Sequence, residues 1–283
     1  MRFSVNIPNF GDFADPRTVA AVAVAAEQAG WDALFVWDHV VHRKQIRRPF
    51  GDPWMLLSAA ALATNRIKLG TLVTPVARRR PHQLARQVST LDNLSGGRVI
   101  LGTGLGAPVE DEYGSFGEPT DPVVLAEMLD EGLHLVDRYW SGDTVTHQGK
   151  HFTADDVALL PTPVQRPRVP IWVAGYWPNK RPMRRAARWD GVVPLFLSAR
   201  HGFTPPVDEV RDLVKYVDSQ RDPGPFEVVL GGTSPADPAK ARDLIGPLAD
   251  AGATWWDERR QQDELITELD PVLRRVEQGP PTL

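Results

Sequence analysis

The sequence predicts an α/β fold, a single (β/α)8 TIM barrel over residues 1–283 with small insertions. Eight short strand-like segments each precede a helix-like segment, an alternation typical of a parallel sheet. Several of these strands are almost continuously apolar, as strands covered on both faces should be. Eight such units in 283 residues match the usual size of a closed barrel, and an open doubly wound sheet is the alternative.

Each predicted strand is a short run rich in β-branched, aromatic or other apolar residues between turn-forming residues. Because parallel strands run in one direction, their carboxyl ends meet at one end of the barrel. In chain order the predicted strands are Phe3–Ile7, Leu34–Trp37, Ile67–Val73, Arg98–Leu101, Pro170–Ala174, Gly191–Leu195, Phe226–Leu230 and Ala253–Trp256.

The predicted helices carry recognisable start and stop signals. Pro16 stands where a first-turn proline is tolerated, and Gly30 ends the helix Thr18–Ala29. Pro122–Trp140 is long and has apolar residues at helical spacing. Thr144–Thr153 has a Gln-Gly pair between β-prone runs and predicts an inserted hairpin. The other predicted helices are Pro53–Thr64, His82–Leu94, Arg181–Arg188, Val207–Ser219, Pro238–Ala251 and Gln262–Val276.

The composition excludes several classes of function. The net charge is −4 with a pI near 6.0 and the two signs are mixed, so we expect no nucleic-acid partner. The absence of cysteine excludes disulfides, thiolate metal sites and cysteine nucleophiles. No apolar run is long enough to cross a membrane, and Met1–Phe3 runs into a strand without a signal-peptide layout. We therefore expect a cytoplasmic location without membrane contact.

The carboxyl ends of the strands, where barrel enzymes place their active sites, argue against hydrolases. A metal-dependent hydrolase needs three or four converging ligands, and only Asp38, His39 and Asp257 qualify. The strand ends offer no pair of glutamates for glycoside hydrolysis, and the chain has no Gly-x-Ser-x-Gly nucleophile elbow. What remains is glycine, tryptophan, asparagine, threonine and one histidine. That set suits a large planar cofactor that carries its own reactivity and needs a dry, well-shaped pocket.

A set of motifs resembles the luciferase-like flavin oxidoreductases. The similarity extends over nearly the whole chain and is densest from Ile67 to Gly104. The combination is specific, whereas any single motif would be weak. The motifs are Ile67–Pro75, Arg80–His82, Ala85–Asp92, Ser95–Arg98, Leu101–Gly104, Phe35–His39, Pro161–Pro167 and Pro170–Gly175.

The resemblance implies a barrel that binds FMN or the deazaflavin coenzyme F420 at the carboxyl ends of its strands. It also implies a non-proline cis peptide near Thr71, Leu72 or Val73, and places His39 over the flavin ring as an acid or base. The implied cofactor-binding residues are Asn6, Asp38, Thr71, Leu72, Val73, Gly102, Thr103, Gly104, Ala174, Gly175 and Tyr176. The implied substrate pocket contains Trp54, Arg80, Trp177 and Trp255, and no metal site is expected.

The sequence departs from the family pattern at two places after the fourth strand. Bacterial luciferase has an arginine near the flavin phosphate there, whereas this sequence reads Gly104–Gly106. Some deazaflavin dehydrogenases have a glutamate just beyond, where this sequence has Ala107. The resemblance implies that the cofactor phosphate lies at the backbone of Gly175 and Tyr176, with Gly231–Thr233 as the alternative.

The hypothesis that follows is an FMN-dependent monooxygenase that oxidises a small organic substrate with O2 and reduced flavin. A separate flavin reductase is the expected partner, because no Gly-x-Gly-x-x-Gly nicotinamide fingerprint follows the first strand. The main alternative is a deazaflavin-dependent reductase or dehydrogenase. A non-catalytic flavin-binding barrel and a metal-dependent hydrolase are further alternatives, and a homodimer is expected because relatives often pair.

Overall fold

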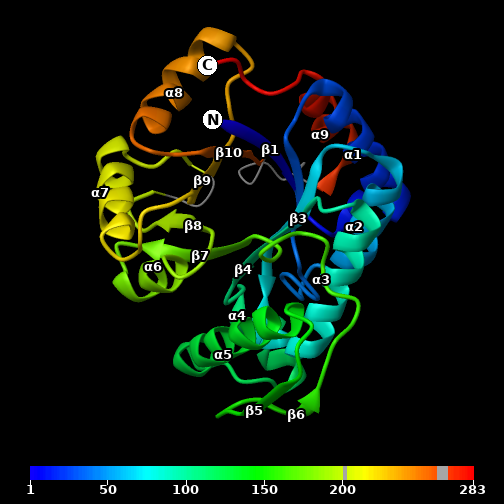
Figure 1. Cartoon of the computed structure of the whole chain (residues 1–283). Helices are drawn as coiled ribbons and strands as arrows, with labels where there is room; N and C mark the ends of the chain where they lie inside the picture. The colour runs from blue at the N-terminus through cyan, green and yellow to red at the C-terminus, as the bar shows by residue number, and fades with distance from the viewer. Residues whose placement is uncertain (200–202, 260–266) are drawn as a thin grey trace.

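The computed structural model describes residues 1–199, 203–259 and 267–283. Within them, eight parallel strands close into a barrel in the spatial order β1-β10-β9-β8-β7-β4-β3-β2 (Figure 1). The predicted (β/α)8 fold is therefore confirmed. The strands are β1 Arg2–Ile7, β2 Ala33–Val36, β3 Lys68–Pro75, β4 Val99–Gly104, β7 Ile171–Trp177, β8 Gly191–Phe196, β9 Glu227–Gly232 and β10 Trp255–Glu258.

Helices surround the barrel, and most of the long ones begin in the same way. Proline occupies the first turn of five of the described helices, and the preceding Asp15, Asp52, Asp121 or Asp237 caps four of them through its side chain. The helices are α1 Pro16–Ala29, α2 Pro53–Ala63, α3 Pro81–Ser95, α4 Val109–Glu112, α5 Pro122–Trp140, α6 Lys180–Ala186, α7 Val207–Asp218, α8 Pro238–Asp250 and α9 Leu269–Glu277, with 3-10 turns η1 Gly11–Ala14, η2 Val76–Arg78 and η3 Gly114–Phe116.

The predicted hairpin is an insertion outside the barrel sheet. Strands β5 (Val145–Gln148) and β6 (Thr153–Val157) pair in antiparallel fashion and lie beside α5 (Figure 1). Glu131 on α5 accepts hydrogen bonds from the main-chain N of Phe152 at 2.8 Å and lies 3.0 Å from His147 Nε2. The hairpin is thus attached through polar contacts to one helix.

Several ends of strands and helices differ from the predicted ends. At β4 the reason is that main-chain pairing continues past the apolar run. Strand β4 extends to Gly104, which pairs with Pro75 of β3. Strand β10 begins at Trp255, two residues later than predicted, and runs to Glu258. Helix α9 begins at Leu269 in the described part of the chain, and the predicted start at Gln262 lies outside the described residues.

The barrel is filled at its amino-terminal end and lined by small residues toward its carboxyl end. Phe35, Trp172 and Trp255 pack together inside, with ring centroids 5.3 Å apart for the two tryptophans and 5.4 Å for Phe35 and Trp172. Further along β4, Gly102 and Gly104 present no side chain. This packing fills the barrel interior next to the amino-terminal ends of the strands, and the small residues lie toward the carboxyl ends, where barrel enzymes bind their ligands.

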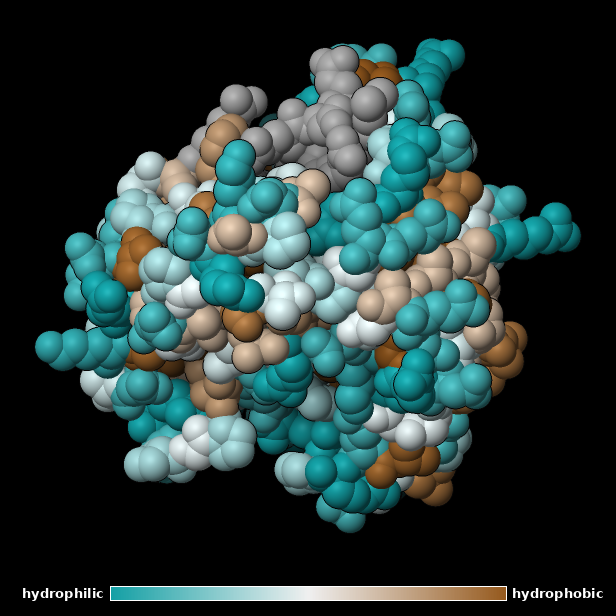
Figure 2. Space-filling model, turned by 90° about the horizontal axis from the view of Figure 1, so that it is seen from above, coloured by the Kyte–Doolittle hydropathy of each residue, from teal (hydrophilic) through white to brown (hydrophobic). Residues whose placement is uncertain are grey.

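We searched the described helices for one that could span a membrane. None of the helices in the part of the chain that the structure describes is long and apolar enough to cross a bilayer. Figure 2 shows one face of the molecule, on which apolar side chains are scattered in small groups among hydrophilic ones.

Candidate active site

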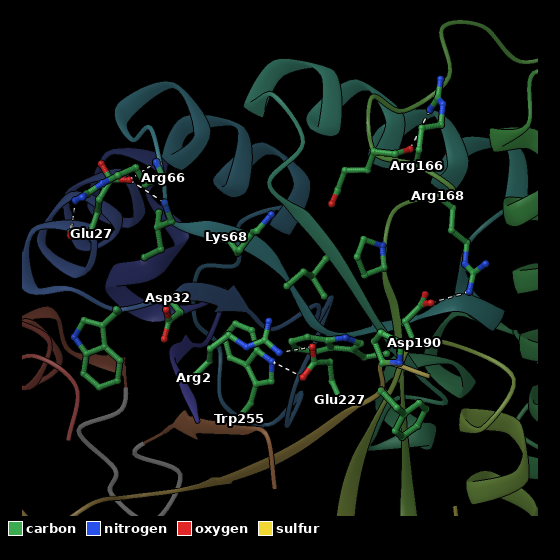
Figure 3. A pocket seen from close by; sticks show the side chains of 18 of the residues that line it. Arg2, Glu27, Asp32, Arg66, Lys68, Arg166, Arg168, Asp190, Glu227 and Trp255 are labelled. Carbon is green, nitrogen blue, oxygen red and sulfur yellow. Dashed lines mark hydrogen bonds and ion pairs between the residues drawn. The ribbon is translucent and has the colours of Figure 1, made fainter. Parts of the chain in front are cut away.

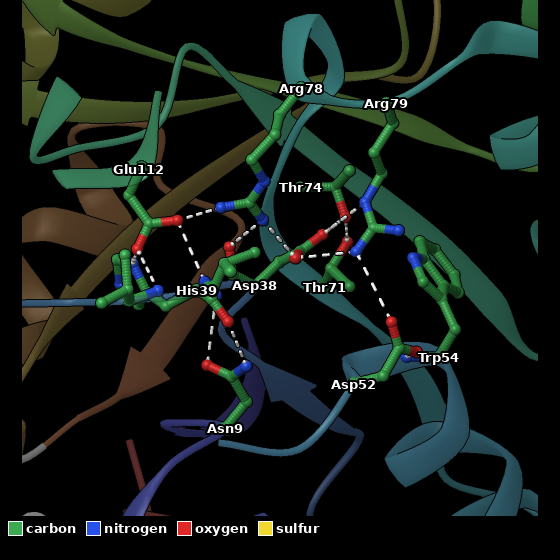
Figure 4. A network of polar contacts seen from close by, with 12 residues as sticks. Asn9, Asp38, His39, Asp52, Trp54, Thr71, Thr74, Arg78, Arg79 and Glu112 are labelled. Carbon is green, nitrogen blue, oxygen red and sulfur yellow. Dashed lines mark hydrogen bonds and ion pairs between the residues drawn. The ribbon is translucent and has the colours of Figure 1, made fainter. Parts of the chain in front are cut away.

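His39 follows β2 at the carboxyl end of the barrel, where Asn9 holds its main chain (Figure 4). Asn9 Oδ1 accepts a hydrogen bond from His39 N at 3.1 Å, and Asn9 Nδ2 donates to His39 O at 2.7 Å. Asn9 is completely buried and also donates to Gly51 O at 2.8 Å. The imidazole itself is 16% exposed, so a fixed main chain presents a partly accessible ring.

Glu112, from the short helix α4, orients the His39 ring. Its Oε1 lies 3.0 Å from His39 Nδ1, its Oε2 accepts from Val40 N at 3.0 Å, and Arg78 forms an ion pair with the same carboxylate. Burial alone would raise the pKa of Glu112. The hydrogen bonds from His39 and Val40, with the nearby charges of His39 and Arg78, nevertheless hold that pKa below its ordinary value. An ionised Glu112 therefore occupies Nδ1 and leaves Nε2 as the ring nitrogen free for chemistry.

Asp38 anchors a buried ionic network next to His39 (Figure 4). Its Oδ1 accepts hydrogen bonds from Arg78 Nη2 at 2.6 Å and from Arg79 Nη2 at 2.8 Å. Its Oδ2 accepts from Arg79 Nε at 3.0 Å and from the hydroxyl of Thr74 at 2.9 Å. The hydroxyls of Thr74 and Thr71 lie 2.9 Å apart. The side chains of Asp38 and Thr71 are therefore used by the protein, and their predicted contact with a cofactor stays a prediction.

Aromatic rings surround the His39 imidazole. The ring centroids of Trp37 and Phe10 lie 5.8 Å and 6.1 Å from that of His39, and His42 lies at 4.5 Å. His42 also stacks on Phe10, with 5.7 Å between centroids and planes 6° apart. Burial, reinforced by the charges of His39, Arg43 and Arg48, lowers the pKa of His42 to about 4, against the weaker influence of Glu112. His42 is therefore neutral near pH 7.

The structure brings together several predicted cofactor-binding residues of β3, β4 and β7. Leu72 faces the barrel interior with Val73 and Ala174 packed beside the same cluster. A Cβ added to Gly104 would lie 3.0 Å from Val73 Cγ2 and 3.5 Å from Ala174 Cβ, so these residues share one surface. The peptide bond between Leu72 and Val73 is cis, which confirms the predicted non-proline cis peptide.

Strand alternation turns two other predicted residues away from that surface. Thr103 is completely buried and donates a hydrogen bond from its hydroxyl to Trp172 O at 3.2 Å. A Cβ added to Gly175 would lie 2.3 Å from Pro182 Cβ, so this glycine faces α6. Only the main chain of these two residues remains available to a ligand.

Asn6 and Asp257 close the barrel mouth between β1 and β10. Asn6 Nδ2 donates to Asp257 Oδ2 at 2.8 Å, and Ser4 Oγ donates to Asp257 Oδ1 at 2.7 Å. Asn6 Oδ1 is buried and has no hydrogen-bond partner in the described part of the chain. A buried acceptor without a donor is unfavourable, which makes Asn6 a candidate contact for a ligand that carries an N–H group.

A cavity of about 150 Å³ opens at the carboxyl ends of β7, β8 and β9. Tyr176, Leu195, Gly231 and Arg259 are among its lining residues. Tyr176, one of the predicted cofactor-binding residues, is 44% exposed. A ligand could therefore enter the barrel mouth next to β7, β8 and β9, on the side away from β2.

The structure does not bring the four residues of the predicted substrate pocket together, and their contact with a substrate stays a prediction. Trp54 and Trp177 belong to the core between the barrel and the helices, since Trp177 alternates with the inward-facing Tyr176. Arg80 is exposed at the start of α3. Trp255 stands at the first position of β10, because that strand begins later than predicted, and therefore lies at the amino-terminal end.

A pocket of about 660 Å³ also lies at that amino-terminal end (Figure 3). Its charged side chains largely pair with one another, as in the ion pair between Arg2 and Glu227 and the 2.9 Å contact between Arg168 Nη2 and Asp190 Oδ1. The guanidinium of Arg2 lies 4.6 Å from the ring centroid of Trp255. Because barrel enzymes act at the other end of the strands, we interpret this pocket as a stabilising face despite its size.

Sequence analysis does not identify Glu112 as a residue of the site. Arg78 and Arg79 complete the network around Asp38, and sequence analysis does not place them there. The available signal for Glu112 is the acidic run Glu110–Glu112 in the segment that follows the fourth strand. Arg259, next to the eighth strand of the barrel, carried no comparable signal.

Curated proteins with similar sequences include dehydrogenases. An F420-dependent glucose-6-phosphate dehydrogenase of Beutenbergia cavernae is 35% identical over 167 residues, which is 58% of this chain and 48% of that protein. An F420-dependent hydroxymycolic acid dehydrogenase of Mycobacterium tuberculosis is 32% identical over 167 residues, 57% of this chain and 44% of that protein. The chain therefore spans about half the length of the curated relatives it matches.

Solved structures share the fold. An F420-dependent secondary alcohol dehydrogenase, in complex with an F420-acetone adduct, superposes with a TM-score of 0.76 at 17% identity. The match covers 96% of this chain and 99% of that one. At this identity the likeness concerns the fold alone.

These comparisons correct the expected activity and cofactor. The hypothesis of an FMN-dependent monooxygenase is wrong, because the relatives at 30% identity or more are named for coenzyme F420 and for dehydrogenation. The resemblance itself is confirmed, since the model of the family described as luciferase-like monooxygenase matches residues 1–268. With the closed barrel and the cis peptide in β3, this match shows that the chain belongs to the luciferase-like monooxygenase family.

Proposed function

We propose that this chain is an F420-dependent oxidoreductase that interconverts an alcohol and a carbonyl group in a small organic substrate. The observation that carries the proposal is His39, which the main chain and Glu112 fix at the barrel mouth with Nε2 free. The 35% identity to an F420-dependent dehydrogenase supports the choice of cofactor. When bound, coenzyme F420 supplies a two-electron hydride acceptor or donor.

The residues at the mouth fit a deazaflavin ring. Gly104, Val73 and Ala174 form a small-residue surface on which a flat ring could lie. Asn6 Oδ1, buried and without a donor among the described residues, would accept from an N–H group of the ring edge. Tyr176 and the main chain of Gly175 would contact the remainder of the cofactor.

His39 would manage the proton of the substrate. As the substrate C–H bond gives up hydride, Nε2 would accept the proton of the hydroxyl group, and in the reverse direction it would return that proton to the carbonyl oxygen. Glu112, on Nδ1, would stabilise the protonated ring and keep its orientation. The aromatic rings of Trp37 and Phe10 would limit the access of water.

Cofactor titrations test the proposal directly. The full chain is titrated with F420 and separately with FMN while tryptophan fluorescence is followed, and turnover of a panel of secondary alcohols is then measured with the cofactor that binds. We expect saturable binding of F420 and loss of its visible absorbance on addition of an alcohol substrate. Binding of FMN with no binding of F420 would refute the proposal.

The role of His39 has its own test. His39→Ala should lower kcat by roughly 10²–10⁴-fold, because a positioned general base contributes about that much. The dissociation constant of F420 should stay unchanged. His82→Ala is the matched control, since His82 is exposed at the start of α3 and should leave kcat unchanged. Equal activity of the wild type and His39→Ala would remove His39 from the mechanism.

A further inference from the structure

The cavity at the ends of β7, β8 and β9 has one charged residue among the described residues that line it. That residue is Arg259, directly after β10, and its other neighbours are mainly apolar or aromatic, such as Leu195, Phe196 and Leu230. The Arg259 side chain is only 8% exposed. A positive charge in a confined, weakly polar space interacts strongly with any anion that enters.

Contacts with β9 and β10 fix Arg259 in place. Its main-chain N donates to Gly232 O at 2.9 Å, and its Nε donates to Asp257 Oδ2 at 2.6 Å. Asp257 is completely buried and already accepts hydrogen bonds from Ser4 and Asn6. The guanidinium is therefore held at Nε and has a defined orientation.

Gly231 makes room for this arrangement. A Cβ on Gly231 would lie 2.3 Å from Arg259 Nε and 2.6 Å from Nη2, a distance that real atoms do not adopt. Gly231 pairs with Asp257 across the two strands, so the glycine, the aspartate and the arginine form one unit. Arg259 can occupy this position because residue 231 is a glycine, and the pairing of β9 with β10 sets the distance between the two residues.

Within the described residues, no hydrogen bond is made by the terminal nitrogens of Arg259. A guanidinium has five N–H donors, and the one on Nε is used by Asp257. Among the described residues, Asp257 is the acceptor that this side chain contacts. Asp257, in turn, has its charge offset by three donors, so a ligand in the cavity faces the guanidinium rather than the carboxylate.

We propose that Arg259 binds an anionic oxygen group, a phosphate or a carboxylate, of a molecule held in the barrel mouth. Its planar fork matches the two oxygens of such a group in a bidentate contact. The group belongs either to the substrate or to the acidic part of the cofactor. The inference rests on the proposed function only for the second of these sources.

Anion binding by the full chain tests the proposal without any turnover. Inorganic phosphate and acetate are titrated into the wild type, R259Q and R259K by calorimetry. We expect saturable binding to the wild type, a loss of at least about tenfold in R259Q, and partial retention in R259K, which keeps the charge but not the fork. R80Q, at an exposed arginine outside the cavity, should bind like the wild type.

A second arm separates the two sources of the anion. If phosphate binds equally to free and F420-loaded protein, and R259Q leaves the F420 dissociation constant unchanged, the group belongs to the substrate. If phosphate competes with F420 and R259Q weakens F420 binding, it belongs to the cofactor. Because phosphate binding needs no cofactor, the first arm stays readable even if F420 does not bind at all.

Two results would overturn the inference. The first is that R259Q binds phosphate and acetate as tightly as the wild type does. The second is that the wild type binds neither anion saturably. Urea unfolding shows whether R259Q is folded. If it is not, Gly231→Ala provides the second variant, because its Cβ displaces the guanidinium and should also weaken phosphate binding.

Discussion

Charges alternate along a chain of four buried or half-buried groups beside the barrel mouth. Asp38 pairs with Arg78, Arg78 pairs with Glu112, and Glu112 contacts His39. Each group therefore has an opposite charge or a hydrogen-bonding partner beside it, which offsets the unfavourable burial of charge. The result at the residue scale is a histidine whose ring orientation is set before any ligand binds.

Glu112 is expected to act as a positioning residue for His39. Glu112→Gln should lower kcat by roughly 10–10³-fold, because a neutral amide no longer stabilises the protonated ring and can favour the wrong tautomer. The dissociation constant of F420 should change little, and the pH profile of kcat should change shape. A purely structural role would instead lower the unfolding midpoint with the pH profile preserved, and Glu112→Asp should restore part of kcat.

His42 should make folding stability depend on pH. Its pKa falls from 6.5 to about 4 in the folded state, chiefly through burial. The unfolded chain therefore binds more protons between these values, so stability decreases as the pH falls from about 6.5 and levels off below about 4.

His42→Phe, which keeps the ring stacked on Phe10, removes this titration. The variant should lose less of its urea midpoint than the wild type between about pH 7 and pH 4. The lowered pKa of Glu112 also reduces the free energy of unfolding on acidification, and it does so in both proteins. The difference between the two pH curves therefore reports the titration of His42. Parallel pH curves would contradict the assignment.

At the scale of elements, Arg98 joins the ends of two helices to the barrel. Arg98 precedes β4 and is 7% exposed, and its guanidinium donates to Ala61 O, Thr64 O and Ile67 O at 2.8–3.0 Å. It also donates to Ser95 O at the end of α3. These carbonyls lie at or beyond helix ends, where the helix itself supplies no donor.

Arg98→Met should therefore destabilise the fold by roughly 2–4 kcal/mol, since several buried carbonyls lose their donors at once. The measurement is the urea midpoint of the two proteins at constant m-value. Arg17→Met on the exposed start of α1 is the control and should change the midpoint little. An unchanged midpoint for Arg98→Met would mean that water replaces the arginine without loss.

The identity and order of the elements could be predicted from the sequence, but some of their ends could not. Helices with a proline start and an aspartate cap, such as α5, begin where predicted because those signals are local. Strand β4 continues to Gly104 because its main chain pairs with β3, and pairing depends on a neighbour that is distant in sequence. The same reason explains why β10 begins at Trp255 and why that residue does not line the mouth.

The whole molecule is closed along the seam between β1 and β10. Phe3 pairs with Trp256 and Ser4 with Asp257 in parallel register, so the first and last strands meet. Asp257 supplies the polar link, because Ser4 and Asn6 of β1 both donate to its carboxylate. A single buried carboxylate thus connects the two ends of the chain and Arg259.

Asp257→Asn should destabilise the closed barrel by roughly 3–5 kcal/mol, because Arg259 is left as an unpaired buried charge. The double variant Asp257→Asn/Arg259→Met should recover part of that loss in urea unfolding. Asp143→Asn, at an exposed position in the loop before the hairpin, is the matched control. If Asp257→Asn and the control unfold at the same urea concentration, the seam does not depend on this charge.

The sequence by itself determined the barrel, the cis peptide in β3, the family and the location of His39 at a strand end. The barrel follows from local patterns of apolar periodicity and turn residues, whereas the cis peptide and the family follow from the resemblance of motifs along the chain. The placement of Glu112 against His39, the burial of Arg79 and the exposure of neighbouring Arg80 were decided only by the tertiary structure. The physical reason is that an ion pair or a shared cavity depends on distances between residues remote in sequence, which are set when the sheet closes.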